Sequence, residues 1–237
     1  MFLVIRMKNF LYLFAFVSCL SLCAALAVYN PDQVVAAEQN VLPAPKNVLI
    51  IDPGHGGLDG GAVGIDGTIE STINLDIGLK MRDLALLFGK NAVMTRDSEQ
   101  LAYPDENAGI AAKKISDQKA RVGLINSFDG AQLISIHQNT YTSPNIHGAQ
   151  VFFRRDDKSK AMAEKIQAAL NSKLISSGRR VASPVSEDIY IMKNINCPAV
   201  LVECGFLSNA DECARLGDST YRTKLAMTIF SAWLVEN

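Results

Sequence analysis

Short apolar runs alternate with longer amphipathic stretches along most of the chain, and turn-forming residues separate them. The apolar runs have the length of buried strands and cover residues 48–51, 92–95, 133–136, 148–153 and 198–202. Apolar positions at helical spacing follow in residues 70–88, 117–126, 158–174 and 219–235. This alternation predicts a single α/β domain, with a mostly parallel central sheet flanked by helices on both faces.

The first part of the chain has a different pattern. Residues 10–28 are almost wholly apolar and follow Arg6 and Lys8, which is the charge order of a signal peptide or a membrane anchor. Ala25 and Ala27 fit a cleavage site, yet nineteen apolar residues also nearly span a bilayer. We therefore expect residues 1–28 to direct export across the cytoplasmic membrane or to anchor the chain to it. Residues 29–47 have neither helical nor strand periodicity and are predicted to be a linker. The predicted folded domain is therefore residues 48–237.

Charge and cysteine content narrow the function classes. Lys and Arg number 23 against 24 Asp and Glu, so the chain has no general electrostatic attraction for nucleic acid, and we predict no nucleic-acid partner. Cys197, Cys204 and Cys213 follow the apolar start, and an odd number cannot close entirely into internal disulfides. Buried free thiols are the simpler interpretation of Cys204 and Cys213.

Four polar residues stand where predicted elements begin or end: His55, Glu70, His137 and Glu203. His55 lies in a glycine-rich loop after the first strand, Glu70 opens a helix, and the other two close strands. Because the carboxyl ends of parallel strands meet at one edge of a sheet, the side chains of His55, His137 and Glu203 are expected to converge. Two imidazoles and a carboxylate can hold a catalytic zinc ion, and a further carboxylate can act as general base. The pattern predicts a metal hydrolase.

Each of these residues also has a purely structural explanation. Glu203 could cap the helix expected near Ser208, and Glu70 could be an ordinary first-turn acid that the helix dipole favours. The glycine-rich loop lacks the fingerprints of nucleotide binding, and it could simply make turns. If Glu203 is functional, burial after the apolar run 199–202 would raise its pKa toward the range useful for proton transfer.

At these residues the chain resembles the catalytic domain of zinc-dependent N-acetylmuramoyl-L-alanine amidases, a family of bacterial cell-wall hydrolases. The resemblance covers about residues 48–233 and rests on the motifs IDPGHGG at 51–57, SIHQN at 135–139 and VECGFLSN at 202–209. It implies that His55, Glu70 and His137 bind Zn²⁺ and that Glu203 is the catalytic carboxylate. It also implies cleavage of the amide between N-acetylmuramic acid and the L-alanine of the stem peptide in peptidoglycan.

Within that family, the short chain with an export segment is similar to the germination-specific amidases of endospore formers. That likeness implies spore cortex peptidoglycan as substrate, a step toward muramic-δ-lactam, and a location in the cell wall or the forespore intermembrane space. The residues alone leave open a zinc peptidase that cuts within the stem peptide, or a non-catalytic peptidoglycan-binding scaffold. No second module that could anchor substrate is present, which motivates the hypothesis of an accessory partner protein.

Overall fold

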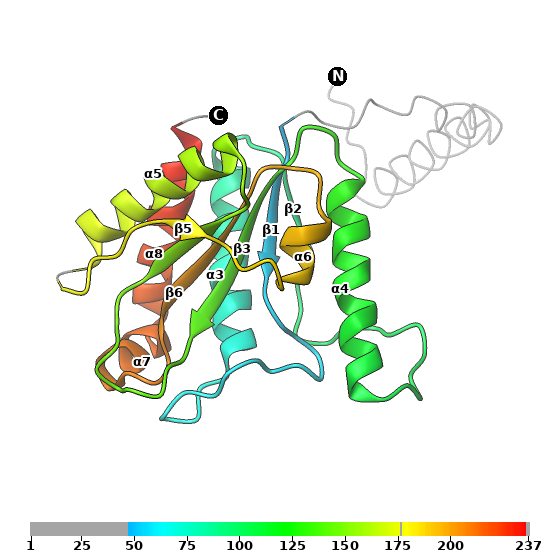
Figure 1. Cartoon of the computed structure of the whole chain (residues 1–237), viewed down its shortest axis with the longest axis horizontal. Helices are drawn as coiled ribbons and strands as arrows, with labels where there is room; N and C mark the ends of the chain where they lie inside the picture. Colours follow the sequence, from blue (N-terminus) through cyan, green and yellow to red (C-terminus); the bar gives the residue numbers. More distant parts are fainter. Residues whose placement is uncertain (1–46, 176, 236–237) are drawn as a thin grey trace, which may run out of the picture. The chain divides into compact units, whose positions relative to one another are not determined.

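The computed structural model describes residues 47–175 and 177–235 (Figure 1). The predicted export segment and nearly all of the predicted linker lie outside the described residues, so that division of the chain stays a prediction. Among the described residues, no helix is both long enough and apolar enough to cross a membrane.

A six-stranded sheet in the order β2-β1-β3-β6-β4-β5 forms the centre of the domain. Its strands are β1 (Leu49–Pro53), β2 (Ala92–Met94), β3 (Gln132–Asn139), β4 (Gln150–Phe153), β5 (Ser183–Pro184) and β6 (Ala199–Phe206). The β2/β1, β1/β3 and β3/β6 pairs are parallel, whereas β4 runs antiparallel to β6. The prediction of a mostly parallel sheet is confirmed.

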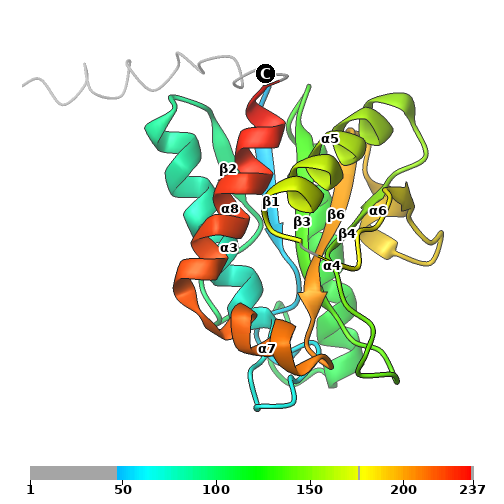
Figure 2. The same ribbon diagram turned by 90° about the vertical axis from the view of Figure 1, so that its left-hand side faces the viewer.

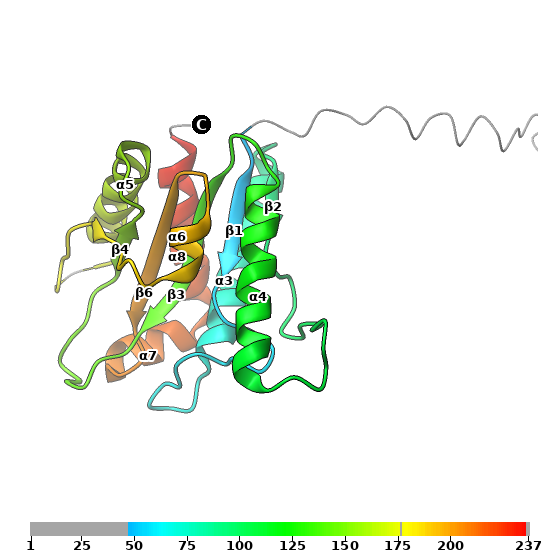
Figure 3. The ribbon, with the colours of Figure 1, turned by 45° about the vertical axis from the view of Figure 1, so that its right-hand side comes forward.

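Helices cover both faces of the sheet, as the sequence predicted. The helices are α3 (Glu70–Leu87), α4 (Ile110–Asn126), α5 (Asp157–Lys173), α6 (Tyr190–Asn194), α7 (Ala210–Gly217) and α8 (Ser219–Leu234). Figures 2 and 3 show α3, α5 and α8 on one face and α4 and α6 on the other.

Successive side chains of one strand point to opposite faces, and this alternation separates the buried residues into two cores. Leu49 and Ile51 of β1 pack on the side of α3, α5 and α8. Ile50 packs on the other side, with Ile125 of α4 and Met192 of α6. All five residues of β1 are buried, which explains why this strand is a continuous apolar run rather than an alternating one.

Some predicted boundaries were wrong, and the differences concern the site. The helix predicted from residue 117 begins at Ile110. His137 and Glu203 do not end their strands but lie inside them, because β3 and β6 continue to pair as far as Asn139 and Phe206. The short helix α6 was not predicted, whereas the helix expected near Ser208 is α7.

Candidate metal centre

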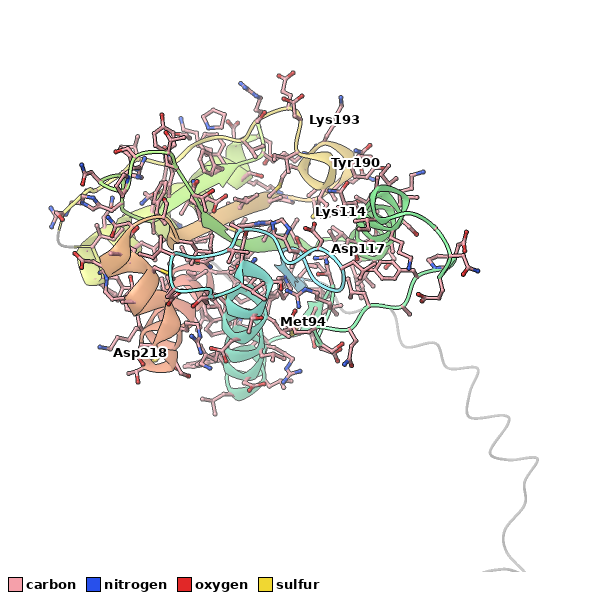
Figure 4. The ribbon with its side chains drawn as sticks, turned by 90° about the horizontal axis from the view of Figure 1, so that it is seen from below. Met94, Lys114, Asp117, Tyr190, Lys193 and Asp218 are labelled. Carbon is pink, nitrogen blue, oxygen red and sulfur yellow. The ribbon has the colours of Figure 1, made fainter. Side chains whose placement is uncertain are left out.

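Three of the four residues singled out in the sequence meet at the carboxyl-terminal edge of the sheet, the edge that Figure 4 views. One ligand atom from each of His55, Glu70 and His137 lies within 4.8 Å of the others. His55 Nε2 is 3.4 Å from Glu70 Oε1, and His137 Nδ1 is 3.1 Å from the same oxygen. The structure thus brings together two imidazole nitrogens and one carboxylate, a donor set typical of catalytic zinc sites.

The carboxylate of Glu70 is held in place by backbone and side-chain donors. Its Oε2 accepts a hydrogen bond from the Ala62 amide at 2.8 Å, and its Oε1 accepts one from the Gln138 amide at 3.0 Å. Burial alone would raise the pKa of Glu70, but hydrogen bonds with His137 and His55 outweigh it and hold the pKa well below its ordinary value. Glu70 is therefore an ionised, oriented carboxylate and more than a first-turn acid.

His55 is oriented by contacts on the side away from the other two candidate ligands. Its Nδ1 lies 3.0 Å from Asp59 Oδ2, which leaves Nε2 facing Glu70. A carboxylate on the second ring nitrogen fixes the tautomer of a metal-binding histidine. His55 also adopts the left-handed backbone region, with φ of 61°, an uncommon conformation outside glycine.

Two glycines bring backbone against these side chains more closely than any other residue would allow. A Cβ on Gly54 would lie 2.2 Å from ring atoms of His137, and one on Gly61 would lie 2.6 Å from Glu70 Oε2. The glycine-rich loop therefore serves the close packing of the three candidate ligands.

Gly54→Ala is accordingly expected to displace the His137 ring and to weaken Zn²⁺ binding by at least about tenfold, the scale seen when the support of a ligand is lost. A Zn²⁺ titration against a competing chelator measures this. Gly109→Ala is the matched control, because its Cβ would meet no atom of the described residues within 4 Å. Unchanged Zn²⁺ affinity in Gly54→Ala would mean that the His137 ring is not a ligand in this position.

Glu203 lies beside these residues on β6, in direct register with His137 on β3. Its Oε2 is buried and has no hydrogen-bond partner among the described residues. Burial raises the pKa of Glu203 to about 7, with His137 acting in the opposite direction. The helix-cap explanation is wrong, because the cap of α7 is Asn209, whose side chain accepts a hydrogen bond from the Glu212 amide.

A cavity of about 360 Å³ opens in front of this group of residues. Helix α4 forms one wall, the segment that leads into α6 forms the other, and strand residues form the floor. The lining residues are Asp52, Gly54, His55, Asp59, Lys114, Asp117, Gln118, Arg121, His137, Asp188, Ile189, Tyr190, Ile191, Leu201 and Glu203. Glu203 thus lines the same space as His55 and His137.

Sequence reasoning missed the link between Arg121 and the site. Arg121 Nη2 donates to the carbonyl oxygen of His55 at 2.6 Å, and Nη1 donates to Asp52 at 2.8 Å. Arg96 donates to the carbonyl oxygens of Pro53 and Gly54. Two buried arginines therefore hold the backbone that carries His55. In the sequence, Arg121 is only an arginine within an amphipathic helix. Such a residue does not indicate a contact with a partner that is distant along the chain.

The comparison with protein families identifies the chain. Residues 49–233 match the family described as N-acetylmuramoyl-L-alanine amidase. The chain belongs to this family. The match spans both walls of the cavity and all four residues singled out above, so the amidase activity and the hydrolase class that the sequence predicted are confirmed.

Individual relatives agree with the family. The amidase is 35% identical to the germination-specific N-acetylmuramoyl-L-alanine amidase of Bacillus subtilis, over 81% of each chain. Its structure resembles that of the CwlD amidase of Clostridioides difficile, solved in complex with the GerS lipoprotein, with a TM-score of 0.76, 36% identity, and coverage of 80% of this chain and 98% of the other. The catalytic domain of CwlV from Paenibacillus polymyxa gives a TM-score of 0.68 at 27% identity, over 80% and 97% of the two chains.

Proposed function

We propose that His55, Glu70 and His137 hold a Zn²⁺ ion and that Glu203 is the general base and acid of amide hydrolysis. The observation that carries this assignment is the convergence of three donor atoms within 4.8 Å beside a buried carboxylate oxygen without a partner. Two nitrogens and one oxygen suit zinc, and three protein ligands leave a position open for chemistry.

Zinc held there would supply Lewis-acid polarisation of the scissile carbonyl and a lowered pKa for attacking water. Glu203 takes the proton from that water and later delivers it to the nitrogen of the leaving L-alanine. Burial raises the pKa of Glu203 above its ordinary value, which helps a carboxylate that must hold a proton between the two steps. Glu70 stays ionised throughout, since His137 and His55 hold its pKa low.

We further propose spore cortex peptidoglycan as the substrate, with removal of the stem peptide preparing muramic acid for conversion to muramic-δ-lactam. Support comes from the similarity over most of both chains to a relative named as germination-specific. A cortex substrate places the enzyme outside the cytoplasmic membrane, in the cell wall or the forespore intermembrane space. The apolar residues 10–28 provide the export signal or the anchor that such a location needs.

An accessory protein is also part of the proposal. The similar amidase from Clostridioides difficile was solved with a lipoprotein bound, and the fold of this chain uses residues 48–235 for one domain, with no described module left to recognise cortex. We expect a partner to assist metal loading or substrate positioning. Equal Zn²⁺ content and equal activity with and without extract of sporulating cells would contradict this part.

Product analysis tests the proposed reaction. The full chain, supplied with Zn²⁺, is expected to release from cortex peptidoglycan stem peptides that begin with a free L-alanine amino group, and to leave peptide-free glycan. Mass spectrometry of both fractions identifies the bond that was cut. Removal of the metal by a chelator should abolish release, and added Zn²⁺ should restore it. Fragments cut within the stem peptide would instead support a zinc peptidase.

A further inference from the structure

Among the residues that the structure describes, one accessible lysine or arginine lines the cavity in front of the candidate metal centre. Lys114 and Arg121, both on α4, are the two basic residues that line it. Arg121 is buried, and its guanidinium is bound to Asp52, Asp117 and the carbonyl oxygens of Pro53 and His55. The side chain of Lys114 is 46% exposed, so it is the cation that a substrate in this cavity would meet. Figure 4 labels Lys114 and Asp117 on α4 and Tyr190 at the start of α6.

Lys114 is also close to the reacting centre. Its Nζ lies 2.8 Å from Asp59 Oδ1, and the other oxygen of Asp59 lies 3.0 Å from His55 Nδ1. One carboxylate therefore separates the ammonium group from a proposed zinc ligand. An ammonium group has three donors, and Asp59 is the one partner that the described contacts give it, so Lys114 can bind a second acceptor without releasing Asp59.

The proposed substrate offers an acceptor at the matching place. The leaving group is a peptide that begins at L-alanine, and the residue after L-alanine in peptidoglycan carries an α-carboxyl group. An extended chain spans at most about 3.6 Å per residue, so that carboxyl group lies within two residues of the bond that is cut. We propose that Lys114 binds this carboxylate and makes the amidase selective for stem peptides with an acidic residue after L-alanine.

The other charged residues of the cavity determine on which wall a substrate carboxylate is favoured. Asp117 is bound to Arg121 through Nε at 2.9 Å, which weakens its repulsion of a bound carboxylate. Asp188 lines the opposite wall and is exposed, and it would repel a carboxylate placed there. A peptide carboxylate is therefore favoured on the α4 wall and disfavoured on the α6 wall.

This inference rests on the proposed function, and its test uses two substrates that differ in a single group. Both are N-acetylmuramoyl tripeptides whose second residue is a D-glutamate linked through its γ-carboxyl group, with the α-carboxyl group either free or converted to a carboxamide. We expect the full-length Zn²⁺ enzyme to favour the free acid in kcat/KM by about fivefold, because partly exposed ion pairs contribute up to about 1 kcal/mol. The difference should lie in KM.

Two variants show whether Lys114 is the origin of the preference. Lys114→Gln keeps an amide donor for Asp59 but loses the positive charge, and its ratio of kcat/KM for acid to carboxamide should fall to about one. Lys119→Gln is the matched control, because Lys119 is an exposed lysine of α4 that does not line the cavity, and its ratio should equal that of the wild type. The Zn²⁺ content of Lys114→Gln should match the wild type, which separates substrate binding from a displaced His55.

Calorimetric binding of both tripeptides to the Zn²⁺ form of Glu203→Gln gives the same preference without turnover. If the wild-type Zn²⁺ enzyme cuts neither compound, but the acid still binds better than the carboxamide and Lys114→Gln removes that binding preference, this inference stands and the proposed function is overturned. Equal hydrolysis and equal binding of acid and carboxamide by the wild type would overturn the role of Lys114 and leave the amidase reaction intact. A preference that survives in Lys114→Gln would also overturn it.

Discussion

Glu203→Gln is expected to lower kcat by at least about a hundredfold, the lower scale for loss of a general base, while Zn²⁺ binding is retained. Glutamine has nearly the same shape as glutamate but cannot accept a proton from water. Glu203 is not among the three groups whose ligand atoms converge, so the substitution leaves the candidate metal ligands unchanged. Steady-state rates on a muramoyl peptide, together with metal analysis of the purified protein, measure both parts.

The same substitution, which lowers kcat, is expected to increase the stability of the metal-free protein at alkaline pH. Burial raises the pKa of Glu203 from 4.5 to about 7, so the folded state binds this proton more tightly than the unfolded chain does. The stability of the wild type therefore declines as pH rises from about 4.5 through about 7, by about 1–3 kcal/mol. Glutamine carries no charge at either pH. Metal-free Glu203→Gln should therefore be more stable than the wild type at pH 8 and similar to it at pH 4.5, as measured by urea unfolding.

Glu164→Gln provides the control for this pair of measurements. Glu164 is an exposed residue of α5 in a surface pair with Lys160, so its replacement should leave kcat unchanged and stability within about 0.5 kcal/mol. Full activity of Glu203→Gln would assign the base to another group. A loss of activity without a gain in alkaline stability would mean that the Glu203 carboxylate is solvated in the folded protein.

The candidate metal centre could be predicted because two of its neighbouring residues, His137 and Glu203, follow strongly apolar segments. The runs around residues 133–136 and 198–202 are continuous because parallel strands are covered on both faces, and His137 and Glu203 interrupt them. A polar residue directly after such a run indicates the end of a strand, and parallel strands have their carboxyl ends at the same edge of the sheet. The convergence of His137 with Glu203 therefore followed from topology, although the strands proved longer than their apolar runs.

The walls of the cavity could not be predicted in the same way. The first turns of α4 contain Lys113 and Lys114, which interrupt the apolar periodicity. The N-cap residue is Gly109, which has no side chain to cap the helix, so neither periodicity nor a capping signal marks the start. Helix α6 has five residues, too few for a periodic pattern. The contact of Arg121 with Asp52 joins residues 69 positions apart, and local sequence carries no information about such a pair. The residues that support the site were thus harder to find than its candidate ligands.

Arg121→Met is expected to destabilise the protein by about 3–5 kcal/mol, because it leaves a buried charge without its partner. Asp52 has no exposed surface. Burial would raise the pKa of this carboxyl, but the charge of Arg121 and hydrogen bonds from Thr95 and Ser135 hold the pKa at about 2. Without the guanidinium, the Asp52 carboxylate stays buried with two hydroxyl donors alone. Urea unfolding at pH 7 measures the loss, and Arg82→Gln, which breaks the exposed pair with Asp83, should cost less than about 1 kcal/mol.

The Arg121 guanidinium compensates the charge of Asp52 and donates to the carbonyl oxygen of His55. Asp52→Asn combined with Arg121→Met separates these two roles. If the orphaned charge causes the loss, the double variant should be more stable than Arg121→Met by about 1–3 kcal/mol, since the Asp52 carboxylate is no longer buried without its partner. Zn²⁺ affinity should stay low in both variants, because neither restores the donor to the His55 carbonyl oxygen, which Arg121 contacts at 2.6 Å. Recovery of Zn²⁺ affinity together with stability would instead show that Arg121 acts on His55 only by keeping Asp52 compensated. No recovery of stability would place the whole effect in the contacts of Arg121 with the backbone of Pro53 and His55.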